Sequence, residues 1–208
     1  MAETYIPLEY GGYYHIYNRG INSCPIFKET SNYEHFLCLY DRYITPVADT
    51  FAWVLMGNHF HLLVRIKEEQ EIRCIPADEK HQEAKPYKPI NQFKHLFNAY
   101  AQAFNKRYKR TGALFETPFE RLRIESETYF KVLVMYIHNN PVKHGFCSHA
   151  NEYPWSSYEN CLSDKITKLK REQVLDWFGD KNLFRLMHSD FNLETDLNDG
   201  LKIKDIGK

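Results

Sequence analysis

The sequence predicts an α+β fold: an antiparallel sheet of four or five strands with helices on one face, in a ferredoxin-like or RNA-recognition-like arrangement. Strand-like runs alternate with helical patterns and no internal repeat is present. Two of these runs flank Gly57-Asn58, a pair typical of tight hairpins, which makes the neighbouring strands antiparallel. With 208 residues, 43% of them hydrophobic, the chain has enough apolar material for one domain with an appendage.

The first part of the chain provides three predicted strands and one helix. Residues 13–17 are aromatic and β-branched, and they end at a turn signal, as a strand does. Residues 31–43 carry apolar side chains at helical spacing. Residues 50–56 and 59–66 are the two strands of the predicted hairpin.

The next part supplies a loop, a helix, an edge strand and a second helix. Residues 67–88 are polar, contain two prolines and are predicted to form a loop. Residues 91–108 form a helical pattern with an aromatic stripe, and residues 118–124 alternate arginine with apolar side chains, as in an edge strand. Ser126 is the expected N-cap of a helix that Pro141 stops after about Asn140.

Composition excludes several classes of protein. No run approaches the roughly 20 apolar residues that cross a bilayer, and the N-terminus lacks a basic flank followed by an apolar segment, so we expect a cytoplasmic protein without membrane contact. The five cysteines form an odd set without C-x-x-C spacing. This pattern argues against a disulfide framework and against a thiolate zinc site.

Charge is unevenly distributed along a chain whose formal net charge is zero. Residues 85–115 contain no Asp or Glu but several Lys and Arg residues. This basic block is either a solvent-exposed face of a helix or a surface that binds the phosphate groups of a nucleic acid.

His59 and His61 lie one residue apart inside an apolar strand. Residues i and i+2 of a strand share a face, so both imidazoles can approach one ion while Phe60, Leu62 and Val64 face the core. The spacing suits a metal site, although half-buried structural histidines also occur in such strands.

Four sequence segments, in this order along the chain, support the metal hypothesis. They are Tyr14-His15-Ile16-Tyr17-Asn18-Arg19-Gly20, Met56-Gly57-Asn58-His59-Phe60-His61-Leu62-Leu63-Val64, Gly112-Ala113-Leu114-Phe115 leading to Arg121, and Tyr136-Ile137-His138-Asn139-Asn140-Pro141-Val142-Lys143. Together they resemble the single-tyrosine HUH transposases, namely the insertion-sequence-200-type enzymes and their REP-associated tyrosine transposase relatives. The resemblance covers residues 13–158 approximately.

The resemblance implies a role for each motif. His59 and His61 would bind a divalent ion, Tyr136 would be the nucleophile, and Asn140 would be the third metal ligand. The implied substrate is single-stranded or hairpin DNA, which is cleaved and rejoined through a 5′-phosphotyrosine. Mg²⁺ prefers oxygen ligands whereas Mn²⁺ tolerates imidazole well, so the choice between these two cofactors stays open.

Basic side chains and one aromatic side chain are the candidates for contact with DNA, by binding phosphates or stacking on unpaired bases. Each of them can equally be an unspecialised surface residue. The candidates are Arg19, Lys106, Arg107, Tyr108, Lys109, Arg110, Arg121, Arg123 and Lys143.

We expect a transposase-like catalytic domain over residues 1–165 and a helical extension with a polar tail over residues 166–208. The extension contains two helical patterns, at residues 170–177 and 181–188, and the tail starts at Asp190. It can complete the core, recognise a DNA hairpin or mediate a homodimer. Whether the helix with Tyr136 acts in its own protomer or in a partner is likewise open.

Two other functions compete with the transposase. A metal-dependent phosphodiester hydrolase would use the histidine pair differently, but a histidine-triad enzyme needs a further histidine where Leu63 stands, and twin His-x-Thr or His-x-Ser motifs are missing. A domesticated DNA-binding protein that no longer cleaves would be expected to have lost His59, His61 or Tyr136, and all three are present.

Overall fold

The computed structural model describes residues 6–72, 74–75 and 85–191. Its centre is a four-stranded antiparallel sheet in the order β2-β3-β1-β6, which confirms the predicted α+β class. The strands are β1 (Tyr13–Arg19), β2 (Ala48–Leu55), β3 (His59–Ile66) and β6 (Glu120–Ile124).

The hairpin between β2 and β3 forms where the Gly57-Asn58 pair predicts it. The amide of Met56 donates to the carbonyl of His59 at 2.7 Å, and the amide of His59 donates back at 3.3 Å. Strand β3 then pairs with β1 in a register that sets Arg19 opposite His59 and Tyr17 opposite His61. This register brings the N-terminal motif alongside the histidine pair.

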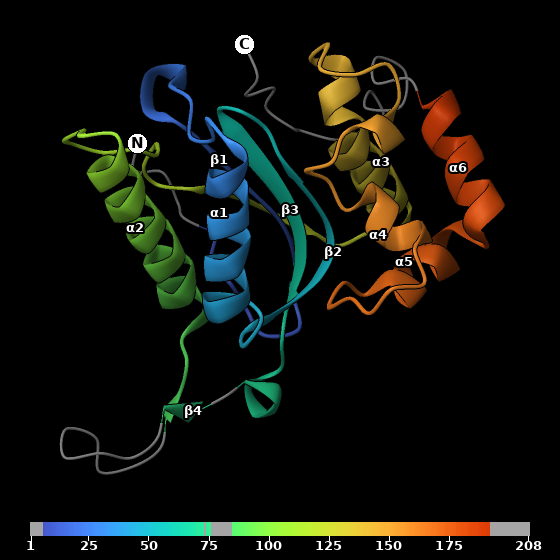
Figure 1. The fold of residues 1–208 in the computed structure, drawn as a ribbon. Helices are drawn as coiled ribbons and strands as arrows, with labels where there is room; N and C mark the ends of the chain where they lie inside the picture. The colour runs from blue at the N-terminus through green and yellow to red at the C-terminus, as the bar shows by residue number, and fades with distance from the viewer. Residues whose placement is uncertain (1–5, 73, 76–84, 192–208) are drawn as a thin grey trace, which may run out of the picture.

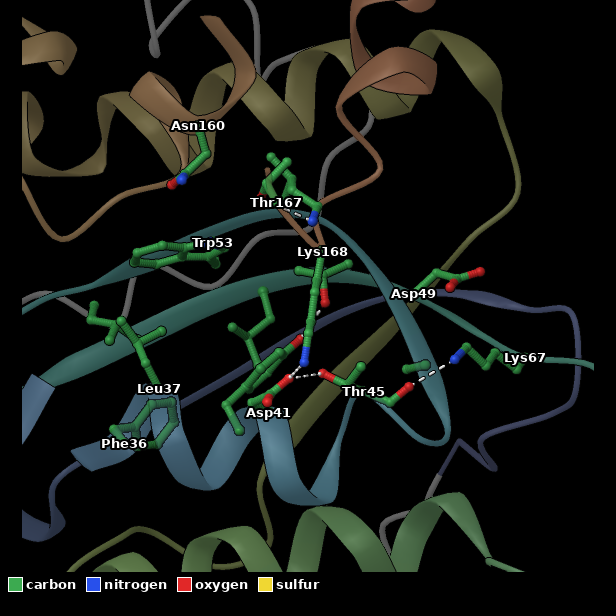
Figure 2. A pocket seen from close by; sticks show the side chains of 16 residues that line it. Phe36, Leu37, Asp41, Thr45, Asp49, Trp53, Lys67, Asn160, Thr167 and Lys168 are labelled. Atoms are coloured by element: carbon green, nitrogen blue, oxygen red, sulfur yellow. Dashed lines mark hydrogen bonds and ion pairs between the residues drawn. The ribbon is translucent and has the colours of Figure 1, made fainter. Parts of the chain in front are cut away.

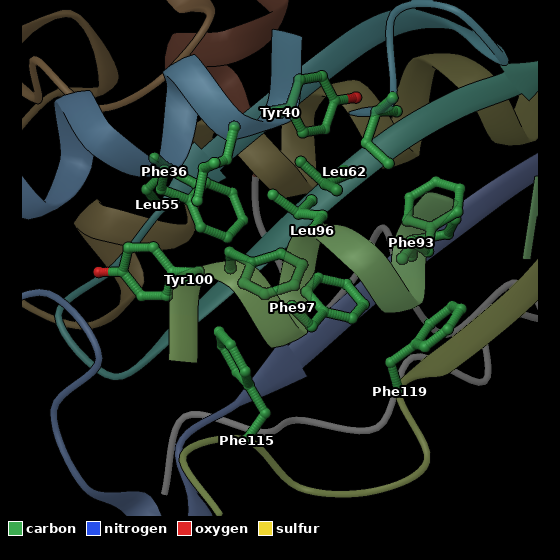
Figure 3. Close-up of a cluster of buried hydrophobic side chains, with 14 of the residues drawn as sticks. Phe36, Tyr40, Leu55, Leu62, Phe93, Leu96, Phe97, Tyr100, Phe115 and Phe119 are labelled. Atoms are coloured by element: carbon green, nitrogen blue, oxygen red, sulfur yellow. The ribbon is translucent and has the colours of Figure 1, made fainter. Parts of the chain in front are cut away.

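Two helices cover one face of the sheet, as predicted. They are α1 (Thr30–Tyr43) and α2 (Pro89–Arg107), which lie side by side in Figure 1. Proline at the first helical position of α2 has the backbone angle that a helix start needs. Phe36 of α1, Phe93 and Phe97 of α2 and Leu62 of β3 pack together in the first core (Figure 3).

The opposite face also carries helices, and this corrects the prediction of helices on one face alone. Figure 1 shows α3 and the later helices on the far side of the sheet from α1 and α2. Phe51, Val54 and Leu63 form an apolar surface there, which must be covered. The covering helices are α3 (Glu127–Lys143), α4 (Tyr158–Leu162), α5 (Arg171–Phe178) and α6 (Lys181–Asp190).

The C-terminal helices of the predicted extension belong to this second core. Trp177 of α5 stacks on Phe130 of α3 at 4.9 Å between ring centroids, and Phe184 of α6 is fully buried. The extension therefore completes the core, which is one of the three roles that the sequence left open for it. Helix α4 was not predicted, and the polar tail beyond residue 191 lies outside the described residues.

Helix α3 continues through Pro141 to Lys143, so the prediction that this proline stops it is wrong. A proline in the last turn removes one hydrogen bond, and tertiary packing of the helix outweighs that loss. Ser126 occupies the predicted N-cap position but its side chain makes no capping hydrogen bond.

The predicted loop at residues 67–88 contains short elements. These are the 3-10 turn η2 (Glu69–Glu71) and the strand pair β4 (Cys74–Ile75) and β5 (Lys85–Pro86). Two further 3-10 turns are η1 (Ile21–Ser23) and η3 (Ala150–Glu152).

The described cysteines whose side chains are placed, Cys24, Cys38, Cys147 and Cys161, are free thiols. Over the described residues, none of the helices combines the length and the apolar character that crossing a membrane requires.

Candidate functional site

Strand β3 separates its side chains as the two-residue period predicts. Phe60, Leu62 and Val64 enter the first core with α1 and α2. His59 and His61 point to the opposite face, with 5.3 Å between their ring centroids. Both are buried, so the pair lies inside the protein between the sheet and α3.

Asn140 of α3 meets His59 directly. Its Oδ1 lies 3.0 Å from Nε2 of His59, while Nδ1 of His59 lies 2.7 Å from Oδ1 of Asn58. When Nδ1 donates to Asn58, Nε2 keeps a lone pair that faces the Asn140 oxygen. Two such acceptors need a cation or a proton between them, unless the amide turns over and donates its own N–H.

His15 of β1 contacts the Nδ1 side of the His61 ring. Nδ1 of His61 lies 3.0 Å from Nε2 of His15, and the two rings stack at 5.1 Å. Nε2 of His61 is buried and has no hydrogen-bond partner among the described residues. A buried nitrogen left in this way is an available metal ligand, and a metal there requires the proton on Nδ1, which then donates to His15.

Burial favours the neutral form of the His61 and His15 imidazoles. It lowers the pKa of His61 well below the usual 6.5, and the positive charges that His15, His59, His144 and Lys143 can carry lower it further. Burial lowers the pKa of His15 to about 3. Neutral imidazole is the form that binds a metal ion.

Tyr136 lies one helical turn before Asn140 and faces the same site. Its ring centroid is 5.4 Å from that of His61 and 6.1 Å from that of His15. The ammonium of Lys143 lies 5.9 Å from the centre of the Tyr136 ring. One chain therefore brings the phenol, both predicted metal histidines and Asn140 together, although the phenol is only 1% exposed.

The donor set fits a divalent ion of intermediate softness. Two imidazole nitrogens and one amide oxygen suit Mn²⁺ better than Mg²⁺, which prefers oxygen ligands alone. The described part of the chain contains no group of three or more His, Cys, Asp or Glu residues arranged to hold a metal. The His59, His61 and Asn140 set depends on an amide as its third member.

A cavity of about 630 Å³ touches the site at His59. His59 and His144 both line it, and the centroids of their rings lie 5.3 Å apart. Gly57 and Asn58 of the β2–β3 turn also line it, and so does the exposed side chain of Phe146.

Sequence reasoning assigned no role to His15 or His144. The two-residue period of a strand places His15 on the same face as Tyr17 and Arg19, and the sequence alone shows this. Its place behind His61 follows only from the register between β1 and β3. His144 comes directly after α3, and no local signal connects it with His59.

The structure brings two of the candidate DNA contacts to the site and leaves the others elsewhere. Lys143 lies near Tyr136, and Arg19 is paired with His59 in the sheet and forms an ion pair with Glu116 at 2.7 Å. The remaining candidates lie at the end of α2 or on the edge strand β6: Lys106, Arg107, Tyr108, Lys109, Arg110, Arg121 and Arg123.

Several of these distant candidates have partners within the protein. Arg107 and Tyr108 both bind the carboxylate of Glu29. Arg123 forms an ion pair with Glu9. Such contacts orient these side chains without excluding a phosphate as an additional partner.

A second cavity, of about 200 Å³, lies between α1, β2 and the segment around Lys168 (Figure 2). The ion pair between Lys168 and Asp41, 2.5 Å long, bridges it. None of the histidines lines this cavity, so it is separate from the candidate site.

No protein-family model matches the sequence, and a search of curated proteins finds no significant relative. Among solved structures, the chain is similar to a REP-associated tyrosine transposase bound to a REP hairpin. The TM-score is 0.58 at 17% sequence identity, over 79% of this chain and 87% of the other. At this identity the comparison shows a shared fold.

Proposed function

We propose that this protein is a metal-dependent DNA strand transferase of the tyrosine transposase type, acting on single-stranded or hairpin DNA. The observation that carries the proposal is the convergence of Tyr136 on His61, at 5.4 Å between ring centroids, beside the contact between His59 and Asn140. The fold shared with a transposase bound to a DNA hairpin supports it.

In the proposed reaction, the phenolic oxygen of Tyr136 attacks a phosphorus atom of the DNA backbone. A bond forms between that oxygen and phosphorus while the bond from phosphorus to the 3′-oxygen breaks. The phenol loses its proton, and the leaving oxygen gains one to become a free 3′-hydroxyl. The 5′-phosphotyrosine conserves the energy of the bond, so a 3′-hydroxyl can later attack it and rejoin strands.

His59, His61 and Asn140 would hold the ion, which when bound neutralises charge on the phosphate and polarises it. His15 and Asn58 orient the two imidazoles through contacts of 3.0 and 2.7 Å. The ammonium of Lys143 adds positive charge 5.9 Å from the centre of the Tyr136 ring. The burial of this group excludes water, which strengthens each electrostatic contact.

The burial of Tyr136 favours a second candidate, a DNA-binding protein of the same fold that does not cleave. A phenol that is 1% exposed cannot reach a DNA phosphate without movement of α3 or its surroundings. Under the proposed function, DNA binding opens the site. Under the second candidate, the site stays closed and no covalent product forms.

The test is to incubate labelled, hairpin-bearing single-stranded DNA with the protein and Mn²⁺ or Mg²⁺. We expect a covalent protein–DNA adduct that Tyr136→Phe abolishes. Tyr17→Phe is the matched control, because Tyr17 is equally buried and its ring lies 5.6 Å from that of His61.

Each outcome separates the candidates. An adduct that persists in Tyr136→Phe removes this residue from its role, and loss of the adduct only in Tyr17→Phe would transfer the role to Tyr17. Binding without any adduct supports the non-cleaving protein. Release of small phosphodiester products without an adduct supports a hydrolase.

A further inference from the structure

Phe146 is an exposed aromatic side chain that lines the same cavity as His59. It is 59% exposed, whereas most of the other phenylalanines of the described residues are buried. Leaving so large an apolar side chain in water forgoes the stabilisation that burial brings. It lines the same cavity as His59 and His144, so a ligand in this cavity would contact the ring.

The backbone holds Phe146 in place. The amide of Gly145 donates to the carbonyl of Val142 at 3.0 Å, and the amide of Phe146 donates to that of Pro141 at 2.9 Å. Gly145 has φ of +71°, so these two bonds form a Schellman motif at the end of α3. In this motif the residue at the place of Phe146 commonly packs back on the helix, yet here it stays exposed.

Tyr153 supports the ring from one side. The two ring centroids are 6.1 Å apart in an edge-to-face arrangement, and the hydroxyl of Tyr153 donates to the carbonyl of Leu55 at 2.8 Å. Phe146 is thus presented by the helix that also carries Tyr136 and Asn140, and it is braced against β2. A rigid exposed ring loses little entropy when a flat ligand stacks on it.

The cavity is suited to a ligand with negative charge. Lys28 lines it on the wall formed by the segment before α1, and its ammonium lies 4.5 Å from the centre of the Tyr108 ring, which positions it. None of the described residues that line the cavity is acidic. At about 630 Å³ it falls within the roughly 300–1,000 Å³ typical of small-ligand pockets.

We propose that this cavity binds one unpaired nucleotide of the DNA substrate, with the base stacked on Phe146 and its phosphate held by Lys28. This inference rests on the proposed function, because it takes the nucleotide to belong to the strand that reaches His59. An aromatic ring and a nearby cation are the two elements by which proteins bind single strands without reading their sequence. Duplex DNA, whose bases are already stacked, cannot use the ring.

The test measures binding of a fluorescein-labelled mixed-sequence single strand of about 12 nucleotides, a length within the usual site sizes. We expect Phe146→Ala to weaken binding at least about fivefold and Phe146→Trp to preserve it. Ile166→Ala is the matched control, since Ile166 is fully exposed and lies outside this cavity. Equal affinity of Phe146→Ala and the wild-type protein overturns the inference.

Lys28→Gln supplies a second measurement. Loss of one phosphate contact should lower the slope of log affinity against log salt concentration by about 0.7 for a single strand. An unchanged slope contradicts the role of Lys28, and an equal loss of affinity for duplex DNA in Phe146→Ala contradicts base stacking.

The adduct assay distinguishes this inference from the proposed function. If Phe146→Ala loses single-strand affinity while Tyr136→Phe still forms an adduct, the nucleotide site stands and the assignment of the nucleophile fails. If the adduct requires Tyr136 but Phe146→Ala binds like the wild-type protein, the nucleotide site fails alone.

Discussion

Nε2 of His15 lies 3.0 Å from Nδ1 of His61, inside the sheet and out of contact with solvent. The contact leaves the other nitrogen of His61 directed away from β1, buried and without a hydrogen-bond partner in the part of the chain that is described. We therefore predict that His15 is a positioning residue: when its Nε2 accepts the proton of Nδ1 of His61, the other nitrogen of His61 keeps the lone pair that a metal ion needs.

His15→Phe should lower the affinity for Mn²⁺ by about 10- to 100-fold, as loss of a contact behind a metal-bound histidine does. The phenyl ring fills the space but cannot accept the proton of His61. Isothermal titration calorimetry measures the affinity. His15→Gln keeps an acceptor and should recover part of it, whereas equal affinities of the Phe variant and the wild-type protein would exclude the positioning role.

Asn140→Asp should retain metal binding and shift the preference toward Mg²⁺, because a carboxylate is a harder ligand than an amide. Asn140→Ala should lose it, since only the two imidazoles remain. The readout is thermal stabilisation by each ion. Undiminished stabilisation of Asn140→Ala by Mn²⁺ would show that this side chain is no ligand.

A buried chain of hydrogen bonds fastens α3 to β2 and α6. The amide of Trp53 donates to Oγ of Ser157 at 2.9 Å, and Oγ lies 2.7 Å from Nε2 of His138. Nδ1 of His138 lies 2.9 Å from Nε2 of His188, whose Nδ1 donates to the carbonyl of Phe184 at 2.7 Å. Each imidazole in this order is a donor at one nitrogen and an acceptor at the other.

Ser157→Ala should lower the free energy of unfolding by about 1–3 kcal/mol, because it leaves the Trp53 amide and the His138 nitrogen buried and unpaired. Urea denaturation measures the change. Ser189→Ala is the control: its exposed hydroxyl only caps carbonyls of α6, so its effect should stay within about 0.5 kcal/mol. Similar values for both variants would refute the importance of the buried chain.

The stability of the protein should fall as the pH drops from about 6.5 to about 4. Burial lowers the pKa of His188 to about 4, so between these values the unfolded chain binds a proton that the folded chain does not. Above pH 6.5 His188 binds no proton in either the folded or the unfolded state, so its contribution to the pH dependence vanishes. The full loss from this residue is roughly 3 kcal/mol and is reached below pH 4.

His188→Leu should flatten the dependence of the unfolding free energy on pH in this window, while the exposed control His35→Gln leaves it unchanged. His138, His61 and His15, whose pKa values burial also lowers, contribute to the slope that remains. Chemical denaturation at a series of pH values provides the measurement. A slope that His188→Leu does not alter would contradict the assignment.

The sequence by itself determined the four strands of the sheet, the helices other than α4, and the faces of the strands. A two-residue period put His59 and His61 on one side of β3 and Phe60 on the other, and Gly57-Asn58 placed the turn, because these signals act between near neighbours. The same locality explains why helix patterns were found within a few residues of their true ends.

Only the tertiary structure decided what surrounds those elements. His15 reaches His61 through strand register, α3 continues past Pro141 because it is packed on the sheet, and Phe146 comes to the cavity of His59 through the turn that ends α3. These relationships join residues far apart in the chain. Their energy comes from burial and from contacts across elements, which a local pattern of residues does not encode.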